Sequence, residues 1–123
     1  MDGEIGNDEM HTLLDAEDAT IVDIRSPAAF RRGHIPGSEN LPLPSLVDNV
    51  ERFEDAERVV TVCPKGKSSQ QAARLIASYE GFDGRVESFK PGLSGWDGGF
   101  EDGVAGDGGT DAGAGDEGPD APF

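Results

Sequence analysis

The sequence is poor in the residues that build disulfides, zinc sites and membrane spans. It contains a single cysteine, which excludes an internal disulfide and any cysteine-based zinc site. No run of about 18 apolar residues is present, so a transmembrane helix is not expected. The N-terminal residues lack the basic and apolar regions of a signal peptide. We therefore expect a cytoplasmic protein that needs no metal and no cofactor.

Basic residues are also scarce. The chain has 25 acidic residues against 10 basic ones, a formal net charge of −15, and only three of the basic residues are lysines. Nucleic acids and anionic membranes bind clusters of Lys and Arg, so the composition predicts neither as a partner. An acidic, lysine-poor surface is typical of a halophilic protein, because at 1 M salt the Debye length falls to about 3 Å and self-repulsion is screened.

The acidic residues become dense toward the C-terminus. Residues 101–123 contain seven acids, seven glycines and no basic residue. Such a composition cannot bury enough apolar surface to fold, so it predicts an acidic, disordered tail over residues 100–123 after one domain over residues 1–99. A solvating role for this tail is the simplest expectation, and docking of a partner protein is the alternative.

The domain alternates between helical and strand patterns. Caps, prolines and glycines mark the expected boundaries, with Asn7, Ser26 and Ser45 as predicted N-caps and Gly33 as a helix stop. A turn and a single helical turn are expected near residues 91–96. The predicted helices span about 7–15, 27–32, 45–53 and 68–79, and the predicted strands span 20–24, 39–41, 58–62 and 85–89.

This alternation favours a parallel sheet with helices on both faces, an α/β fold. In such sheets, sites lie outside the carboxyl ends of the strands. Cys63 directly follows the most apolar predicted strand and precedes a predicted helix start. The sequence therefore predicts a site at this cysteine.

The loop after Cys63 suits a reactive thiol. A helix start has unpaired N–H groups and a positive dipole end, which favour the thiolate, the nucleophilic form. The N–H groups of residues 65–69 can converge on the sulfur, and Gly66 permits the positive φ that such a turn needs. Lys65 and Lys67 would attract an anionic substrate. The alternative is that Cys63 is a small buried hydrophobic residue.

Four segments together resemble the rhodanese family, in particular its single-domain sulfurtransferases. The resemblance implies a three-layer fold with a central, mostly parallel sheet. It implies that Cys63 takes a sulfane sulfur from a donor such as thiosulfate, becomes a persulfide and passes the sulfur to a thiol or to cyanide. The segments are Val22–Arg25, Phe30–Pro42, Val60–Ser69 and Pro91–Trp96.

The same resemblance assigns roles to other residues. The loop after Cys63 would cradle the sulfur through Lys65, Gly66, Lys67, Ser68 and Ser69. Ser68 stands where many family members have Arg, so anion binding would depend more on the two lysines and the backbone.

Three residues outside the loop, Asp23, Arg25 and His34, match family positions that look structural. They are expected to tie the turn that follows Gly33 to the sheet.

Two other functions are compatible with a cysteine loop in this kind of fold. Phosphatases and arsenate reductases of this fold have Cys-x5-Arg, but Ser69 occupies the arginine position, so the bidentate guanidinium that binds a tetrahedral oxyanion is missing. The second alternative is a rhodanese-like carrier or binding module with little small-molecule turnover, which would dock with a sulfur-relay protein.

Overall fold

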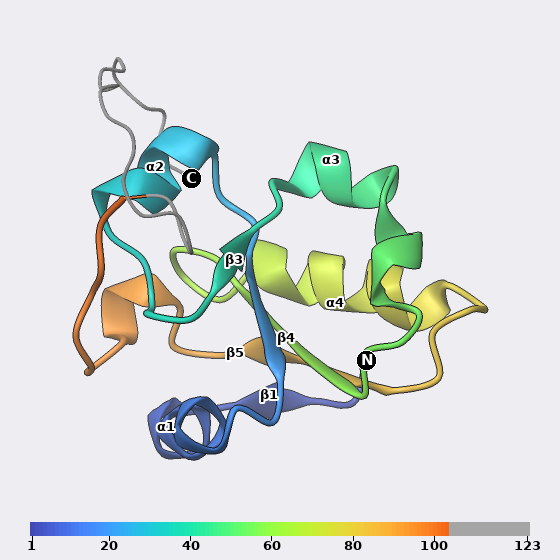
Figure 1. The fold of residues 1–123 in the computed structure, drawn as a ribbon, viewed down its shortest axis with the longest axis horizontal. Coiled ribbons are helices and arrows are strands. Elements are labelled where there is room, and N and C mark those ends of the chain that lie inside the picture. The colour runs from blue at the N-terminus through green and yellow to red at the C-terminus, as the bar shows by residue number, and fades with distance from the viewer. Residues whose placement is uncertain (104–123) are drawn as a thin grey trace.

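The computed structural model describes residues 1–103, which form a five-stranded parallel sheet. Helices cover this sheet (Figure 1). The strand order is β1-β5-β4-β2-β3. The strands are β1 (Glu4–Ile5), β2 (Thr20–Asp23), β3 (Glu39–Asn40), β4 (Arg58–Val62) and β5 (Arg85–Phe89). The helices are α1 (Asn7–Ala16), α2 (Pro27–Arg32), α3 (Leu43–Val47) and α4 (Ser68–Ser78), with two 3-10 turns, η1 (Val50–Phe53) and η2 (Leu93–Gly95).

Strand β4 is the centre of the sheet. It pairs in parallel with β2 on one side and with β5 on the other. Its side chains alternate between two separate apolar cores, with Val59 in one and Val60 and Val62 in the other. Because both faces are covered, three of its five residues are valine and apolar side chains point to both faces instead of one.

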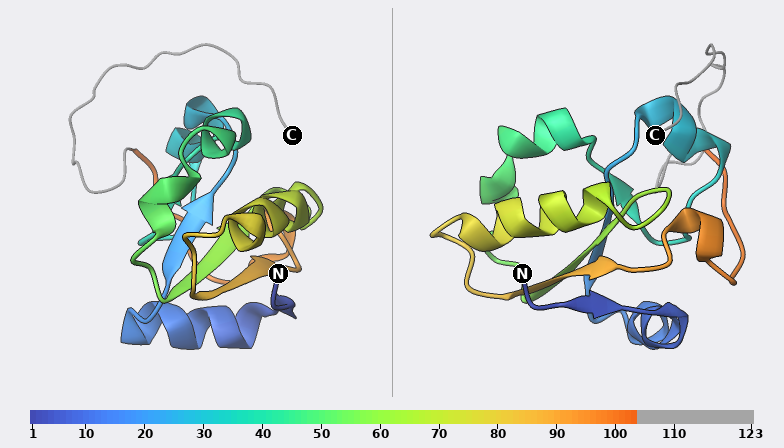
Figure 2. Two further views of the ribbon diagram at one scale, coloured as in Figure 1. Left: turned by 90° about the vertical axis from the view of Figure 1, so that its right-hand side faces the viewer. Right: turned by 180° about the vertical axis from the view of Figure 1, so that it is seen from behind.

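The two cores define three layers. On one face, α4 contributes Ala72, Ala73 and Ile76 to a core that also holds Leu46 of α3. On the opposite face, α1 contributes Met10 and Leu13, and the turn η2 contributes Leu93. Figures 1 and 2 show α1 on one side of the sheet and α3 and α4 on the other. The predicted α/β fold with a parallel central sheet and helices on both faces is confirmed.

Two predicted N-caps were wrong. Helix α1 has Gly6 as its N-cap, while the side chain of Asn7 donates to the carbonyl oxygen of Gly95. Helix α3 begins at Leu43, so Ser45 lies inside it, because Pro42 and Pro44 fix the backbone for the first helical turn. In contrast, Ser26 caps α2 as predicted, accepting a hydrogen bond from the N–H of Ala29.

One strand was not predicted at all. Strand β1 has two residues, too few to show a period, and it pairs in parallel with β5 through Glu4 and Ile5. It forms the edge of the sheet next to β5.

The described chain continues past the expected domain end at residue 99. Glu101 and His34 exchange two backbone hydrogen bonds of 2.8 and 2.9 Å, and the N–H of Gly103 donates to Arg31. Contacts with the domain therefore extend into the segment predicted as tail, whose remaining residues, 104–123, lie outside the described part. Within residues 1–103, no helix has the length and apolar character needed to cross a bilayer.

Candidate active site

The Cys63 sulfur lies at the point where β4 gives way to the start of α4. The residue is only 2% exposed. Its Sγ accepts hydrogen bonds from the N–H groups of Gly66 (3.1 Å) and Ser69 (3.2 Å), two of the donors expected from the sequence. The N-cap residue of α4, Lys67, makes no side-chain cap, so the sulfur takes the place of a capping acceptor. This position stabilises negative charge on the sulfur.

The loop around the sulfur is fixed by a second turn that follows β5. Gly66 has φ +80°, and a Cβ there would lie 2.1 Å from the carbonyl oxygen of Lys90. Gly92 has φ +69°, and a Cβ there would lie 2.5 Å from the carbonyl oxygen of Pro64. The N–H groups of Leu93 and Ser94 donate to the carbonyls of Cys63 and Pro64. The turn after β5 therefore fixes the loop from Cys63 to Gly66.

A chain of buried hydroxyl groups extends below the sulfur. The thiol donates to Ser69 Oγ at 3.3 Å, and this hydroxyl is 2.6 Å from Ser88 Oγ on β5. Thr61 Oγ1 donates to the carbonyl oxygen of Ser69 at 2.6 Å. The sequence interpretation missed Ser88 and Thr61. Hydroxyl residues inside otherwise apolar strands were the available signal.

The other loop residues lie on the surface. Lys65, Lys67 and Ser68 are exposed, whereas Gly66 and Ser69 are buried against the sulfur. The loop therefore presents backbone N–H groups inward and two ammonium groups toward solvent.

A pocket of about 320 Å³ opens beside the cysteine. Cys63, Pro64 and Ser68 form one side of it. The opposite side comes from the end of β2 and the starts of α2 and α3. These opposite residues are Ile24, Arg25, Ser26, Pro27, Pro42, Leu43 and Pro44. The sequence interpretation used the prolines only as helix boundaries and did not assign them to a pocket.

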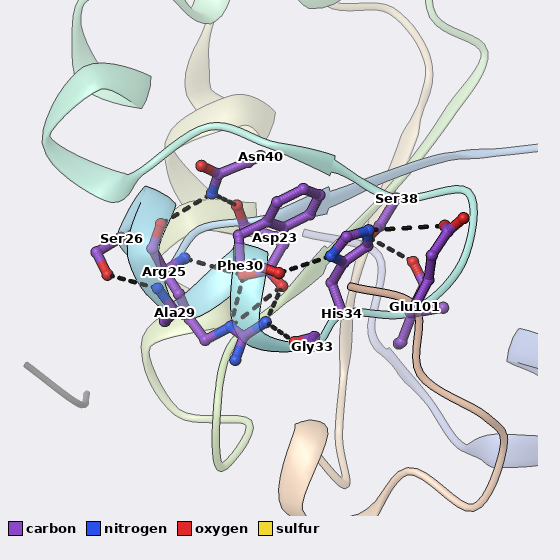
Figure 3. A network of polar contacts seen from close by, with 11 residues as sticks. Asp23, Arg25, Ser26, Ala29, Phe30, Gly33, His34, Ser38, Asn40 and Glu101 are labelled. Atoms are coloured by element: carbon purple, nitrogen blue, oxygen red, sulfur yellow. Dashed lines mark hydrogen bonds and ion pairs between the residues drawn. The ribbon is translucent and has the colours of Figure 1, made fainter. Parts of the chain in front are cut away.

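Asp23 and Arg25 form a fork at the end of β2 (Figure 3). Arg25 donates from Nε and Nη2 to both carboxylate oxygens of Asp23, at 2.9 and 2.7 Å for the shorter contacts. The same Nη2 donates to the carbonyl oxygen of Gly33 at 2.7 Å. Asn40 adds hydrogen bonds to the backbone carbonyls of Asp23 and Arg25. The fork therefore joins the sheet to the end of α2.

His34 joins the same region to the C-terminal segment. Its ring is fully buried and stacks on Phe30, with centroids 3.7 Å apart. Nδ1 lies 2.6 Å from the carbonyl oxygen of Phe30, so Nδ1 carries a proton and donates. Nε2 has no hydrogen-bond partner in the described structure and faces the Glu101 carboxylate at 3.7 Å (Figure 3). These contacts pack the segments around α2 against one another, and they do not involve the Cys63 sulfur.

Comparison with known proteins gives the family. A rhodanese-like domain matches residues 6–99, three quarters of the chain. The chain belongs to the rhodanese-like domain family. The match confirms the resemblance drawn from the motifs, and it includes the Cys63 loop and the 91–96 turn.

Named relatives of this rhodanese-like protein include bacterial sulfurtransferases. The chain is 37% identical over 92 residues to thiosulfate sulfurtransferase GlpE of Pseudoalteromonas translucida, covering 75% of this chain and 86% of the relative. It is 38% identical over 93 residues to the protein of that name in Pseudomonas entomophila, covering 76% of this chain and 77% of the relative.

Solved structures share the fold over nearly the same region. The human single-domain sulfurtransferase TSTD1 is 25% identical with a TM-score of 0.65, over 76% of this chain and 93% of that one. A rhodanese-like domain protein from Staphylococcus aureus is 26% identical with a TM-score of 0.70, over 82% of this chain and 98% of that one.

Proposed function

We propose that this rhodanese-like sulfurtransferase carries sulfane sulfur as a persulfide on Cys63, with thiosulfate as a donor. The observation that carries the proposal is the position of Sγ, which accepts two backbone N–H groups at the start of α4. Relatives that align over three quarters of the chain are named for thiosulfate. Both observations support the same chemistry at the same atom.

The first half-reaction is a displacement at sulfur. The Cys63 thiolate attacks the outer sulfur of thiosulfate, the S–S bond of thiosulfate breaks, and sulfite leaves with the electron pair. The product persulfide is an anion that carries its charge on the terminal sulfur. The N–H groups of Gly66 and Ser69 donate to Sγ, one bond from this terminal sulfur, so the positive end of α4 offsets negative charge on the persulfide.

The second half-reaction regenerates the thiolate. An acceptor thiolate, or cyanide, attacks the terminal sulfur, the persulfide S–S bond breaks, and its electron pair returns to Cys63. The hydroxyl of Ser69 lies 3.3 Å from Sγ and can donate to the returning thiolate. A sulfur-relay protein that presents its own thiol is an acceptor of the same chemistry.

The two exposed lysines of the loop are proposed to attract the anionic donor. Support comes from their position on either side of Gly66 and from the scarcity of lysine in the chain. Asp23, Arg25 and His34 are proposed as structural residues, since their side chains bind one another's segments and not the sulfur.

We also propose a cytoplasmic, high-salt setting for the protein. The net charge of −15 supports it, because such a chain repels itself less when salt screens the charges.

The test is an intact mass measured after incubation with thiosulfate. We expect a gain of one sulfur atom in the wild type, its removal by cyanide, and no gain in Cys63→Ser. Ser94→Ala, which alters a neighbouring hydroxyl that makes no side-chain contact with Sγ, is the matched control and should still gain sulfur. A wild-type mass that stays unmodified with thiosulfate and with organic sulfane donors would exclude the proposed function.

A further inference from the structure

Two hydroxyl residues, Thr61 of β4 and Ser88 of β5, are fully buried below the Cys63 loop. They are register partners on the two neighbouring strands, and each has an exposed fraction of 0%. Val59 and Val86, which lie two residues earlier on the same face of the sheet, belong to the apolar core under α4. A buried hydroxyl costs free energy unless it is hydrogen-bonded, so an apolar residue would be the ordinary choice at both places.

Both hydroxyls bind Ser69, the residue whose N–H and hydroxyl groups contact the sulfur. Thr61 Oγ1 donates to the backbone carbonyl oxygen of Ser69 at 2.6 Å, which holds the first turn of α4 over the strands. Ser88 Oγ lies 2.6 Å from Ser69 Oγ, which in turn lies 3.3 Å from Cys63 Sγ. Among residues 1–103, Ser69 Oγ is the only hydrogen-bond partner of the Ser88 hydroxyl. Ser88, Ser69 and the sulfur therefore form one chain of hydrogen bonds.

This chain can point in either direction, because a hydroxyl group carries one hydrogen and also accepts. When Cys63 is a neutral thiol, its S–H donates to Ser69, and Ser69 donates to Ser88. When the sulfur is an anion, Ser69 donates to Sγ, and Ser88 donates to Ser69. Either serine oxygen can be the donor at the observed distance, so both directions use the same positions of the heavy atoms.

From this geometry we propose that Ser88 is a positioning residue for the sulfur chemistry, and that it acts through Ser69. Its hydroxyl donates to Ser69 Oγ and turns the hydrogen of Ser69 toward an anionic Cys63 sulfur. A hydroxyl that accepts a hydrogen bond is also a stronger donor, since neighbouring hydrogen bonds polarise one another where the local dielectric is low. The proposal rests on the persulfide function of Cys63 described above.

An anionic Sγ occurs at two points of the proposed cycle. It attacks the donor in the first half-reaction, and it is the leaving group that receives the electron pair in the second. At both points the Ser69 hydroxyl adds a third donor to the N–H groups of Gly66 and Ser69. While the sulfur is anionic, the hydrogen of each serine stays on its own oxygen, so the balance of both half-reactions is unchanged.

The test measures how the reactivity of Cys63, the single cysteine, depends on pH. Cys63 lines the neighbouring pocket, so a small reagent such as iodoacetamide has access to it, and its alkylation rate follows the thiolate. We expect the midpoint of this profile to rise by about 1 pH unit or more in Ser69→Ala and by about half a unit in Ser88→Ala. The acid limb of the kcat/KM profile for thiosulfate should shift by the same amounts, because the thiolate is the attacking form.

The charged side chains on the segments next to the loop stay in place in every variant, so a shift of the profile reports the hydroxyl groups. They are Lys65 and Lys67 of the loop, Arg25 across the pocket, Lys90 of the turn after β5, and Glu4 of β1, which accepts from Gln70 of α4.

Two further variants separate positioning from a loss of packing. Ser38→Ala removes another buried hydroxyl, which donates to the carbonyl oxygen of Ile35 at 2.7 Å and does not belong to the chain below the sulfur. It should lower the urea midpoint about as much as Ser88→Ala does and leave the pH profile unchanged. Ser88→Thr keeps a hydroxyl on a residue that suits a strand, and it should restore the wild-type profile.

A double variant tests whether Ser88 acts through Ser69. In the Ser69→Ala background, Ser88→Ala should shift the alkylation midpoint no further, because the hydroxyl that Ser88 orients is already gone.

The results that contradict the positioning role differ from those that contradict the persulfide function. If thiosulfate loads Cys63 but Ser88→Ala keeps the wild-type profile, or shifts it equally with and without the Ser69 hydroxyl, Ser88 has no positioning role and the persulfide function stands. An equal shift in Ser38→Ala would have the same meaning. If no donor places sulfur on Cys63, the persulfide function is wrong, and Ser88 has no role in sulfur transfer.

Discussion

Gly66 shows how one residue without a side chain shapes the sulfur site. Its φ of +80° lies in the left-handed region, and the carbonyl oxygen of Lys90 occupies the space where a Cβ would be, at 2.1 Å. The same residue donates its N–H to Sγ. Backbone conformation, packing against the turn after β5 and charge stabilisation at the sulfur therefore all depend on this position.

Replacing Gly66 by alanine should disturb both folding and chemistry. We expect Gly66→Ala to lower the free energy of unfolding by at least about 3 kcal/mol, because the loop must move away from Lys90 as well as adopt a strained φ. Persulfide formation should slow in parallel, since the N–H of residue 66 leaves the sulfur. Urea unfolding followed by the fluorescence of Trp96, together with the mass assay, measures both effects.

Gly37→Ala is the matched control for that experiment. Gly37 has a similar φ of +89°, but a Cβ there would meet only Leu14 at an ordinary 3.8 Å. Its cost should be the backbone strain alone, about 1–2 kcal/mol, with sulfur loading unchanged. Equal losses in the two variants would mean that the close approach to Lys90 contributes nothing.

Tyr79, at the end of α4, gives a pH-dependent readout of a single contact. Its phenol donates to the Glu54 carboxylate, and this hydrogen bond raises the pKa of Tyr79 above its ordinary value of 10.0, with smaller contributions from burial and from the charges of Glu54 and Glu51. Because the folded pKa is the higher one, the contact stabilises the fold below pH 10 and is lost as pH rises through the folded pKa.

We expect the Glu54→Ala substitution to lower the pKa of Tyr79 toward 10.0, because it removes the hydrogen bond that raises this pKa. Glu51→Ala, which removes only the weakest of these effects, should move it less. Since the chain has one tyrosine, phenolate absorbance reports this residue alone. An unchanged titration in Glu54→Ala, with a normal unfolding midpoint, would contradict the contact.

At the level of elements, a buried acid joins α1, β4 and β5. Glu87 is 1% exposed on β5 and accepts two hydrogen bonds from Arg58 of β4 and one from Arg85. Arg58 also donates to Glu9 of α1. The hydrogen bond with Glu87 is the main cause that raises the pKa of Arg58. Three elements that are distant in sequence are thus joined by one network.

Removing the charge at Glu87 should be costly. We expect Glu87→Gln to lower the free energy of unfolding by about 3 kcal/mol, because two arginines lose their buried counter-charge. Glu39→Gln is the comparison, since Glu39 pairs with Arg52 in a pair whose side chains are 45% and 49% exposed, and its loss should cost about 0–1 kcal/mol. Equal losses in urea unfolding would show that burial does not strengthen the Glu87 network.

The sequence predicted the elements whose signals are local. Strand β4, helix α4 and the position of Cys63 between them follow from an apolar run, a loop with one glycine and a helical pattern. The parallel topology follows from their alternation. The N-caps of α1 and α3 were predicted wrongly because more than one residue near each helix start could cap it. The side chain of Asn7 binds Gly95 instead, and prolines set the start of α3.

What the sequence did not predict depends on contacts between distant segments. Ser69 and Ser88 meet across 19 residues of chain, and Glu101 returns to His34 across the domain. The apolar pocket forms only when the starts of two short helices face the cysteine loop. The periodicity or spacing of one segment cannot indicate a contact with a distant segment, because the local pattern is the same whether or not that contact forms.

At the level of the whole molecule, the net charge of −15 opposes compactness. With 25 acidic residues against 10 basic ones, ion pairs cannot neutralise most of the acids, so much of this repulsion remains. Salt should therefore stabilise the fold, since the Debye length falls from about 10 Å at 0.1 M to about 3 Å at 1 M. We expect the urea midpoint, followed by the fluorescence of Trp96, to rise steadily with KCl over this range.

A charge variant separates screening from other effects of salt. Replacing the five acids of residues 104–123 by their amides leaves a net charge of −10 without altering any described residue. The rise with KCl should then be smaller, because less self-repulsion remains to be screened, and the midpoint at 0.1 M should be higher than in the wild type. A rise of the same size in both chains would instead assign the salt effect to strengthened burial of apolar surface, which depends on the core and not on the charge.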